Sequence, residues 1–245
     1  MSPLSPRNLR EKCFCVTNVA DVTPRDPILE GMFKLRVLSE WTCQGCQQVH
    51  TAQPQDETGL QLQITSPAGP NTTIQSFVEA YFSDVVIDAE CERCKSRSNR
   101  RRVRTINAPP EVLFIQLQRF ERDYNISTGR FTTSKITKDV PFGQWLDLSR
   151  FAQSQTFRHP GSLRYKLSSV VAHQGTLNNG HYIAFGQGPQ GVLKYNDSRV
   201  TKSSLSEMLH PSNDFTPYIL TYTICESTTA NAETTRTVAM EAVPH

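Results

Sequence analysis

Residues 170–200 read VVAHQGTLNNGHYIAFGQGPQGVLKYNDSRV. The segment holds two strand-like runs that a Gly-rich turn separates, which is the pattern of a β-hairpin. His181 opens the first run, and Asn196 and Asp197 follow the second, so the hairpin would bring an imidazole beside an amide or a carboxylate. Either group can accept the imidazole N–H and orient the ring as a general base. The segment therefore predicts half of a catalytic pair on antiparallel strands.

The flanking sequence contains further strand-like segments and few helices. Leu60, Leu62 and Ile64 alternate with polar residues, as in a half-buried strand. The segment Thr73–Phe82 has helical spacing of its apolar residues, and Thr72 or Thr73 could cap that helix. Strands are also expected at 32–38, 112–117, 164–173, 180–185, 191–195 and 217–224, with a short helix at 203–209. Because strands dominate, the expected fold class is α+β with an antiparallel sheet.

The charge balance gives little reason to expect a nucleic-acid or membrane partner. The 245 residues include 26 basic and 23 acidic ones, for a net charge of +3. The one basic run is Lys95–Arg104, and it is more typical of a solvated or loop-borne charge run than of a partner-binding patch. No apolar run has membrane-spanning length, and the first ten residues, MSPLSPRNLR, contain no hydrophobic signal core. We therefore expect an intracellular protein, cytoplasmic or nuclear.

The composition also divides the chain into three parts. Residues 1–25 are expected to form a flexible leader, because they are rich in Pro and have no sustained period. Residues 26–225 contain the strand-like segments and form the expected folded domain. The Thr- and Ala-rich residues 226–245 are expected to be disordered.

Four of the seven cysteines form two CxxC pairs, which are typical of a zinc site. Cys43 and Cys46 make the first pair, Cys91 and Cys94 make the second, and 44 residues separate the two pairs. Two such turns can close a tetrahedral site of four thiolates, and that site would be structural because it leaves no position open for water. Buried free cysteines or one redox pair are the alternatives. Disulfides are not expected in an intracellular chain.

The CxxC pairs and the histidine segment together resemble the ubiquitin-specific protease family, a family of papain-like cysteine proteases. The segment Ala108–Phe120, APPEVLFIQLQRF, is similar to the family's PP-x-x-L-x-x-x-L-x-R-F strand. The histidine segment contains His173-Gln-Gly175, Gly180-His-Tyr182 and Asn196-Asp-Ser198 in the family's order, and Pro217–Leu220 resembles the closing strand. The resemblance covers about residues 26–225. It implies zinc-bearing fingers at about 28–105 and an antiparallel-sheet-rich palm at about 106–225.

The resemblance also implies an activity and residue roles. A member of the family is a thiol protease that cleaves isopeptide or peptide bonds at the C-terminus of ubiquitin, so ubiquitin and ubiquitinated proteins are the implied partners. His181 would be the general base, and Asn196 or Asp197 would orient it. The turn at His173, together with Gly175, Gly180 and Tyr182, would line the channel for the Gly-Gly tail of ubiquitin, where glycines let backbone approach substrate closely. Structural Zn²⁺ is the implied cofactor.

The chain departs from the family pattern at its start. No Q-D-A-x-E-F signature precedes Cys43, so we expect the thumb to be missing. The family's cysteine segment has a partial counterpart, in which Asn8 and Cys13 occupy the positions of the oxyanion-hole residue and the nucleophile. Arg10 and Lys12 replace the family's Gly and Thr. These departures favour an ordinary thiol in a flexible leader, and the alternative is a working nucleophile.

Three functional hypotheses follow. The first is an active deubiquitinase, the second is a ubiquitin-binding pseudoprotease, and the third is a truncated fragment that lacks the nucleophile. They differ in whether a thiol reaches His181 and in whether the rest of the domain still holds ubiquitin.

Overall fold

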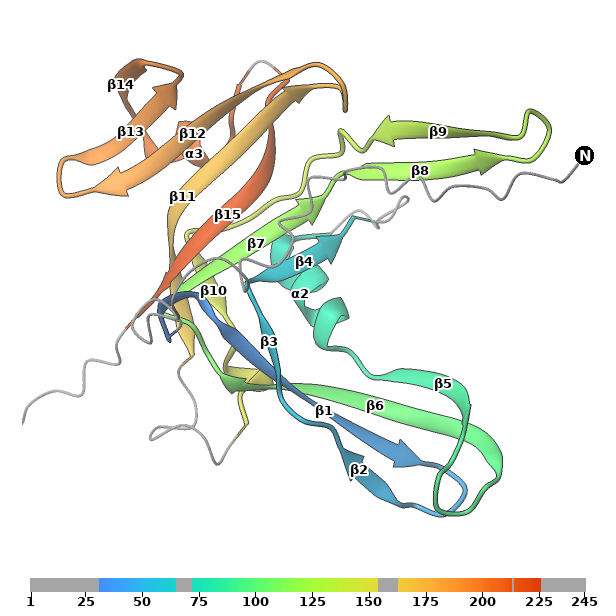
Figure 1. The fold of residues 1–245 in the computed structure, drawn as a ribbon. Coiled ribbons are helices and arrows are strands. Elements are labelled where there is room, and N and C mark those ends of the chain that lie inside the picture. The colour runs from blue at the N-terminus through green and yellow to red at the C-terminus, as the bar shows by residue number, and fades with distance from the viewer. Residues whose placement is uncertain (1–30, 65–71, 154–162, 213, 226–245) are drawn as a thin grey trace, which may run out of the picture.

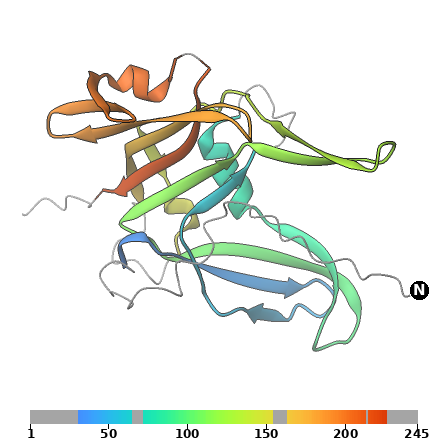
Figure 2. The same cartoon turned by 45° about the horizontal axis from the view of Figure 1, so that its top comes forward.

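The computed structural model describes residues 31–64, 72–153, 163–212 and 214–225. These residues form two large sheets and one two-stranded hairpin (Figure 1). Figures 1 and 2 place the two sheets at opposite ends of the molecule, with the hairpin projecting past the end of the larger one. We call them the finger sheet, the palm sheet and the arm.

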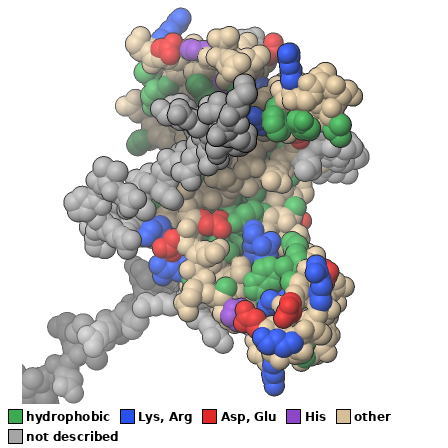
Figure 3. All heavy atoms as spheres, turned by 45° about the vertical axis from the view of Figure 1, so that its right-hand side comes forward, with side chains coloured by type: hydrophobic (Ala, Val, Ile, Leu, Met, Phe, Trp, Pro, Cys, Tyr) green, Lys and Arg blue, Asp and Glu red, His purple; other side chains and the backbone are tan. Residues whose placement is uncertain are grey.

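The finger sheet has five strands, in the order β2-β1-β6-β5 with β3 also paired to β1, and all of its pairings are antiparallel. Its strands are β1 (Leu35–Cys43), β2 (Val49–Thr51), β3 (Gln55–Glu57), β5 (Val85–Glu90) and β6 (Arg97–Ala108). Seen from the side in Figure 3, the finger end at the bottom carries basic and acidic side chains around hydrophobic ones.

The palm sheet has eight strands, in the order β14-β13-β12-β11-β15-β7-β4 with β10 also paired to β11. Its strands are β4 (Leu60–Gln63), β7 (Val112–Gln118), β10 (Trp145–Asp147), β11 (Arg164–Gly175), β12 (Gly180–Gly188), β13 (Gly191–Asn196), β14 (Arg199–Ser203) and β15 (Thr216–Ile224). The pairing of β4 with β7 is parallel, and the other pairings of this sheet are antiparallel.

Alternation along the palm strands builds the core. In β7, Leu113, Ile115 and Leu117 are fully buried, while Phe114 points to the other face and stacks on Phe33. The core continues into the base of the finger sheet through buried residues that include Leu35, Val37 and Ile106. One continuous apolar interior therefore connects the two sheets, because each contributes its alternate positions to it.

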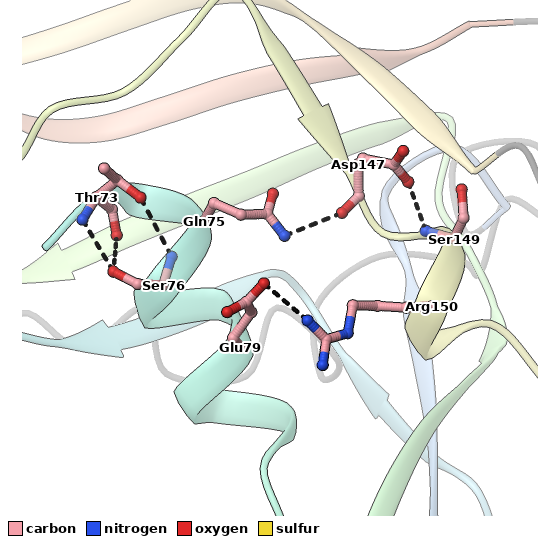
Figure 4. Close-up of polar contacts among 7 residues, drawn as sticks. All are labelled: Thr73, Gln75, Ser76, Glu79, Asp147, Ser149 and Arg150. Atoms are coloured by element: carbon pink, nitrogen blue, oxygen red, sulfur yellow. Dashed lines mark hydrogen bonds and ion pairs between the residues drawn. The ribbon is translucent and has the colours of Figure 1, made fainter. Parts of the chain in front are cut away.

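Helix α2 (Ile74–Phe82) packs between the sheets and begins at a capping box. The Thr73 hydroxyl accepts the Ser76 N–H, and the Ser76 hydroxyl accepts the Thr73 N–H, so two N-terminal donors are satisfied. The apolar stripe of α2 (Ile74, Phe77, Val78 and Phe82) is buried. Figure 4 shows its polar side, where Gln75 donates to the Asp147 carbonyl and Glu79 pairs with Arg150 of the 3-10 turn η2 (Ser149–Phe151).

The arm consists of β8 (Phe120–Asn125) and β9 (Arg130–Lys135), and a buried arginine holds its base. The Arg119 side chain is fully buried and donates to the carbonyls of Pro217, Ile136 and Lys138 at 2.6, 3.0 and 2.8 Å. Burial lowers the pKa of Arg119 to about 10, so the group stays charged at neutral pH. Because an isolated hairpin is marginally stable, this tie to β15 helps to fix the arm.

We expect replacement of Arg119 by methionine to lower the free energy of unfolding by about 3–5 kcal/mol. The change keeps a long side chain but leaves the buried Pro217 carbonyl and the partly buried carbonyls of Ile136 and Lys138 without their donor. Urea denaturation measures the loss. Arg130→Met, an exposed change on the same arm, is the matched control and should cost less than about 0.5 kcal/mol. A loss below about 1 kcal/mol for Arg119→Met would contradict this account.

The α+β, sheet-rich fold class predicted from the sequence is confirmed, with differences in detail. Most of the Lys95–Arg104 run lies in β6 and not in a loop, because its backbone pairs with β1 on one side and with β5 on the other. Residues 31–33 are helical, so the first strand starts at Leu35 rather than Met32. The expected leader and tail lie outside the described residues.

Candidate functional site

The β11–β12 hairpin lies in the interior of the palm sheet and carries the histidine segment at the ends of its two strands. Gly175 pairs with Gly180 at its end, and a four-residue turn connects them. Gly175 has a φ of +106°, a conformation that side chains other than glycine rarely adopt. A Cβ at Gly180 would lie 2.0 Å from Nε2 of His173, so only glycine fits between the two histidines. The two glycines therefore set the shape of the strand end that presents His181.

His181 and Asn196 meet as the hairpin pattern predicts. His181 is the second residue of β12, Asn196 is the last residue of the neighbouring β13, and His181 Nε2 lies 2.6 Å from Asn196 Oδ1. Asp197 lies beyond hydrogen-bond distance, with Oδ2 4.0 Å from the same nitrogen. Its φ of +51° places it in the tight turn between β13 and β14, and 80% of its side chain is exposed. The residue in contact with the imidazole is thus Asn196.

This contact determines which ring nitrogen can act as a base. An amide oxygen only accepts hydrogen bonds, so Nε2 carries the hydrogen and donates it to Asn196. Nδ1 then holds the free lone pair that can accept a proton. The His181 side chain is 42% exposed, and the edge of the ring meets Phe215 at a centroid distance of 6.1 Å. The arrangement can therefore remove a proton from a group that approaches from the exposed side.

The other predicted channel residues form an aromatic wall beside His181. His173 is buried, and its ring contacts Tyr182 at a centroid distance of 4.5 Å and Tyr218 at 6.3 Å. Burial, followed by the charge of Lys135, lowers the pKa of His173, so its ring is neutral at pH 7. Tyr182, by contrast, is half exposed. In this structure the surface of the wall is Tyr182, and His173 supports it from beneath.

The arm contributes to this wall, which the sequence reasoning did not anticipate. Lys135, the last residue of β9, donates to the His173 carbonyl at 2.8 Å, and Phe120 lies edge-on to the His173 ring. Thr216 donates to the same carbonyl at 3.1 Å. The available signal was a pair of segments, 120–125 and 130–135, on either side of the turn that follows Asn125.

The described cysteines leave the exposed side of His181 without a thiol. The structure describes five of the seven cysteines, and four of these form a cluster in the finger sheet. The fifth, Cys225, donates its N–H to the Arg164 carbonyl at the opposite end of β11, roughly 30 Å away at about 3.3 Å per residue. Cys13 and Asn8 lie outside the described residues, so their proposed roles remain predictions.

The two CxxC pairs meet at the tip of the finger sheet. Cys43 Sγ lies 4.0 Å from Cys94 Sγ, and Cys46 Sγ lies 3.8 Å from Cys91 Sγ. All four sulfur atoms fall within 4.8 Å of one another. In a tetrahedral site with Zn–S bonds of about 2.3 Å, neighbouring sulfurs are about 3.8 Å apart. The four side chains therefore fit one tetrahedral metal ion without rearrangement of their backbone.

Both turns of this cluster have the same backbone pattern. In each turn, the backbone N–H of the first cysteine donates to the carbonyl of the residue five positions later. The carbonyl of that cysteine accepts the N–H of the residue four positions later. That fourth residue, Gln47 in one turn and Lys95 in the other, has a positive φ. A hydrogen bond with the Ser98 hydroxyl, then one with the Cys46 backbone, lowers the pKa of Cys43 to about 6. For Cys46, a hydrogen bond with the Gln48 backbone lowers the pKa, but burial and the neighbouring thiols outweigh it and raise the pKa to about 11.

Within the described residues, no helix is long and apolar enough to cross a membrane. The family model for ubiquitin carboxyl-terminal hydrolase matches residues 8–222. Ubiquitin carboxyl-terminal hydrolase 2 of Gallus gallus is 31% identical over 190 residues, which cover 75% of this chain and 50% of that protein. Ubiquitin carboxyl-terminal hydrolase 8 of Saccharomyces cerevisiae is 29% identical over 206 residues, which cover 80% of this chain and 41% of that protein.

Solved structures show the same similarity. One similar structure is a SAGA DUB module of Ubp8, Sgf11, Sus1 and Sgf73 bound to monoubiquitin. A chain of that module superposes on this chain with a TM-score of 0.68 and 26% sequence identity. The match covers 81% of this chain and 42% of the chain in the module. The Ubp8 module bound to ubiquitin aldehyde gives a TM-score of 0.66 and 25% identity, with 90% and 45% coverage. The chain thus spans about half, or less, of the length of these relatives.

Proposed function

The chain belongs to the ubiquitin carboxyl-terminal hydrolase family, and we propose that it hydrolyses isopeptide or peptide bonds at the C-terminus of ubiquitin with a cysteine nucleophile. Ubiquitin and ubiquitinated proteins are the proposed substrates. A related module has been solved with monoubiquitin bound, which supports ubiquitin as the ligand of this domain too.

The observation that carries the proposal is the contact between His181 and Asn196. Its 2.6 Å distance holds the imidazole with Nδ1 as the basic nitrogen. Nδ1 would take the proton from a thiol, and the thiolate would attack the carbonyl carbon of the last ubiquitin residue. The imidazolium would then protonate the leaving amine, leaving a thioester that water hydrolyses with His181 as base. Asn196 would hold the ring in one tautomer throughout these steps.

The nucleophile is proposed to be Cys13. Of the seven cysteines, four share the finger cluster and Cys225 lies at the far end of β11, so Cys13 and Cys15 are the remaining thiols of this chain. The family match begins at residue 8 and so includes both, and the spacing of Asn8 five residues before Cys13 supports Cys13 over Cys15. Asn8 would then donate to the oxyanion that forms on the attacked carbonyl.

The finger cluster is proposed to hold one structural Zn²⁺. Its sulfur separations of 3.8 and 4.0 Å match a tetrahedral ZnS₄ site, and four thiolates saturate the ion. Bound there, the ion would cross-link the turn after β1 with the turn after β5, at a tip that has little apolar core of its own. The proposed role is thus to stabilise the fingers and not to activate water.

A second candidate function is ubiquitin binding without cleavage. The observation that favours it is that Arg10 and Lys12 replace the family's Gly and Thr around Cys13, so the chain departs from the family pattern at the proposed nucleophile. In that case the palm and fingers would hold ubiquitin while the bond beside His181 stays intact. Both candidates require ubiquitin binding, and they differ in whether a thiol reaches the site.

Ubiquitin with a C-terminal propargylamide separates the two candidates, because it forms a covalent adduct only with a reactive thiol at the site. We expect one adduct on the wild-type chain by intact-mass spectrometry, its loss in Cys13→Ala, and its retention in the neighbouring control Cys15→Ala. Absence of an adduct with micromolar ubiquitin binding in calorimetry would reject hydrolysis and support binding alone. Absence of both would reject the two candidates together.

A further inference from the structure

Strand β6 places three arginines on one face of the finger sheet. Arg100, Arg102 and Arg104 occupy alternate positions, and alternate side chains of a strand share a face. The register pairs Arg102 with Trp41 of β1, so this tryptophan lies on the same face. We call the three arginines and Trp41 the arginine row. It lies in the finger sheet, which Figure 1 places away from the end of the palm sheet that carries His181.

Aromatic rings hold the three guanidinium groups in place. The Cζ atoms of Arg100 and Arg102 lie 5.7 and 5.4 Å from the centroid of the Trp41 ring. Arg104 lies 4.8 Å from the centroid of Tyr81, at the end of α2. Cation–π contacts of this kind orient a guanidinium without neutralising its charge. The row is therefore a fixed set of positive charges.

The acidic residues of the sheet neutralise the other face of β6. Arg97 pairs with Asp88, and Arg101 pairs with Asp84, both from β5 or the residue before it. Within the described residues, no carboxylate pairs with Arg100, Arg102 or Arg104. Glu57, which lies beyond Tyr81, accepts the Tyr81 hydroxyl at 2.5 Å. The two faces of β6 therefore differ: the described arginines on one face pair with carboxylates, and the three arginines of the row on the other face do not.

The unpaired face carries closely spaced positive charges that an acidic ligand could neutralise. The Nε atoms of Arg100 and Arg102 are buried and have no hydrogen-bond partner in the described structure. Burial, and next the neighbouring charge of Arg104, lower the pKa of Arg102. These two Nε atoms are too deep for a ligand to reach, so what this face offers a ligand is the closely spaced positive charge of the guanidinium groups. A carboxylate of a ligand would neutralise part of that charge.

We propose that the arginine row is a docking site for an acidic, extended polypeptide segment of a partner or substrate protein. Alternate residues of a strand repeat about every 6.6–6.8 Å, so the row matches the spacing of alternate Asp or Glu side chains in an extended peptide. The planar guanidinium groups suit bidentate contacts with carboxylates. Because Trp41 and Tyr81 already contact arginines, neither is a free platform for stacking bases, and carboxylates are favoured over single-stranded nucleic acid.

The proposal extends the function of the domain without depending on its catalysis. A segment bound to the fingers would hold a protein at a distance from the bond beside His181, and it would add affinity to that of the ubiquitin part of a conjugate. The docking site would act in the same way in an active hydrolase and in a ubiquitin-binding pseudoprotease. Its test therefore measures binding and not hydrolysis.

A fluorescein-labelled twelve-residue peptide of alternating Glu and Asp is the probe, titrated with the full chain at low salt and followed by fluorescence anisotropy. We expect Arg100→Gln/Arg102→Gln to weaken binding about tenfold or more. The matched control is Arg97→Gln/Arg101→Gln, which removes the same charge from the same strand but from the other face. We expect that control to weaken binding less than threefold. Zinc content and far-UV circular dichroism check that both variants keep the fold.

Three outcomes would overturn the proposal. Equal weakening by the two double variants would show that net charge, and not the row, attracts the peptide. Absence of saturable binding at low salt would remove the docking site altogether. Tighter binding of an oligo-dT of similar length, lost in Arg100→Gln/Arg102→Gln, would assign the row to nucleic acid instead.

Discussion

Replacement of His181 by alanine is expected to slow adduct formation with ubiquitin propargylamide by about 10²–10⁴-fold. The imidazole is the group that would remove the thiol proton, and no other described side chain takes its place beside Asn196. The fold should survive, because the side chain is 42% exposed and lies at the start of a strand. The rate of adduct formation measures the effect, with ubiquitin affinity as the control for folding. An undiminished rate would remove His181 from the mechanism.

The two residues beside His181 should respond differently to the same change. Asn196→Ala removes the 2.6 Å contact with His181 and should slow the reaction by about 10–10²-fold. This factor corresponds to the free energy of a hydrogen bond to a group that becomes charged. Asp197→Ala removes a carboxylate 4.0 Å away and 80% exposed, and it should change the rate less than about threefold. The reverse order of effects would assign the orienting role to Asp197.

Loss of one cysteine of the finger cluster is expected to release the metal and unfold the finger tip. In Cys91→Ser, zinc measured by mass spectrometry should fall from one per chain to near zero, because three thiolates bind the ion far more weakly than four. We expect the melting temperature to drop by about 10 °C or more. Hydrogen exchange should accelerate in β1, β5 and β6 near the turns, while β11 and β15 in the palm sheet stay protected.

Cys225→Ser is the matched control for this prediction. It makes the same atomic change at a cysteine that follows β15 and lies outside the cluster. Zinc content and melting temperature should stay close to those of the wild type. Stoichiometric zinc and an unchanged melt in Cys91→Ser would show that the four sulfurs hold no structural metal.

Local patterns predicted most of the palm. The strands at 112–117, 180–185 and 191–195 and the helix after Thr73 have strong periodicity or a capping signal, and each lies close to its expected bounds. The finger strands β2, β3 and β5 were missed, because they are short and largely exposed, so no hydrophobic alternation marks them. The basic run in β6 looked like a loop because its charged residues show no hydrophobic alternation, and because one of its two partner strands, β1, is far away in the sequence.

The candidate site, too, was only partly predictable from the sequence. The residue types at 181, 196 and 197 suggested an imidazole with an amide or acid partner, but they left two candidates for that partner. The turn between β13 and β14 separates the two, because it bends the chain after Asn196 and carries Asp197 outward. The burial of His173 beneath Tyr182 could not be predicted from the sequence either, because it depends on how the arm and β15 pack against β11.

By itself, the sequence determined the chemistry available to this protein: four cysteines in two turns, one histidine at a strand end, and a family pattern that covers most of the chain. Those features are local, or they repeat a known order of motifs, so they can be identified without coordinates. Only the tertiary structure decided which groups meet. The packing of the strands brings Asn196 to His181 and the sulfurs of two distant turns to one centre. It also places three arginines on one face of β6 and the arginines that pair with acids on the other. Register depends on the packing of the whole sheet, and no single segment encodes it.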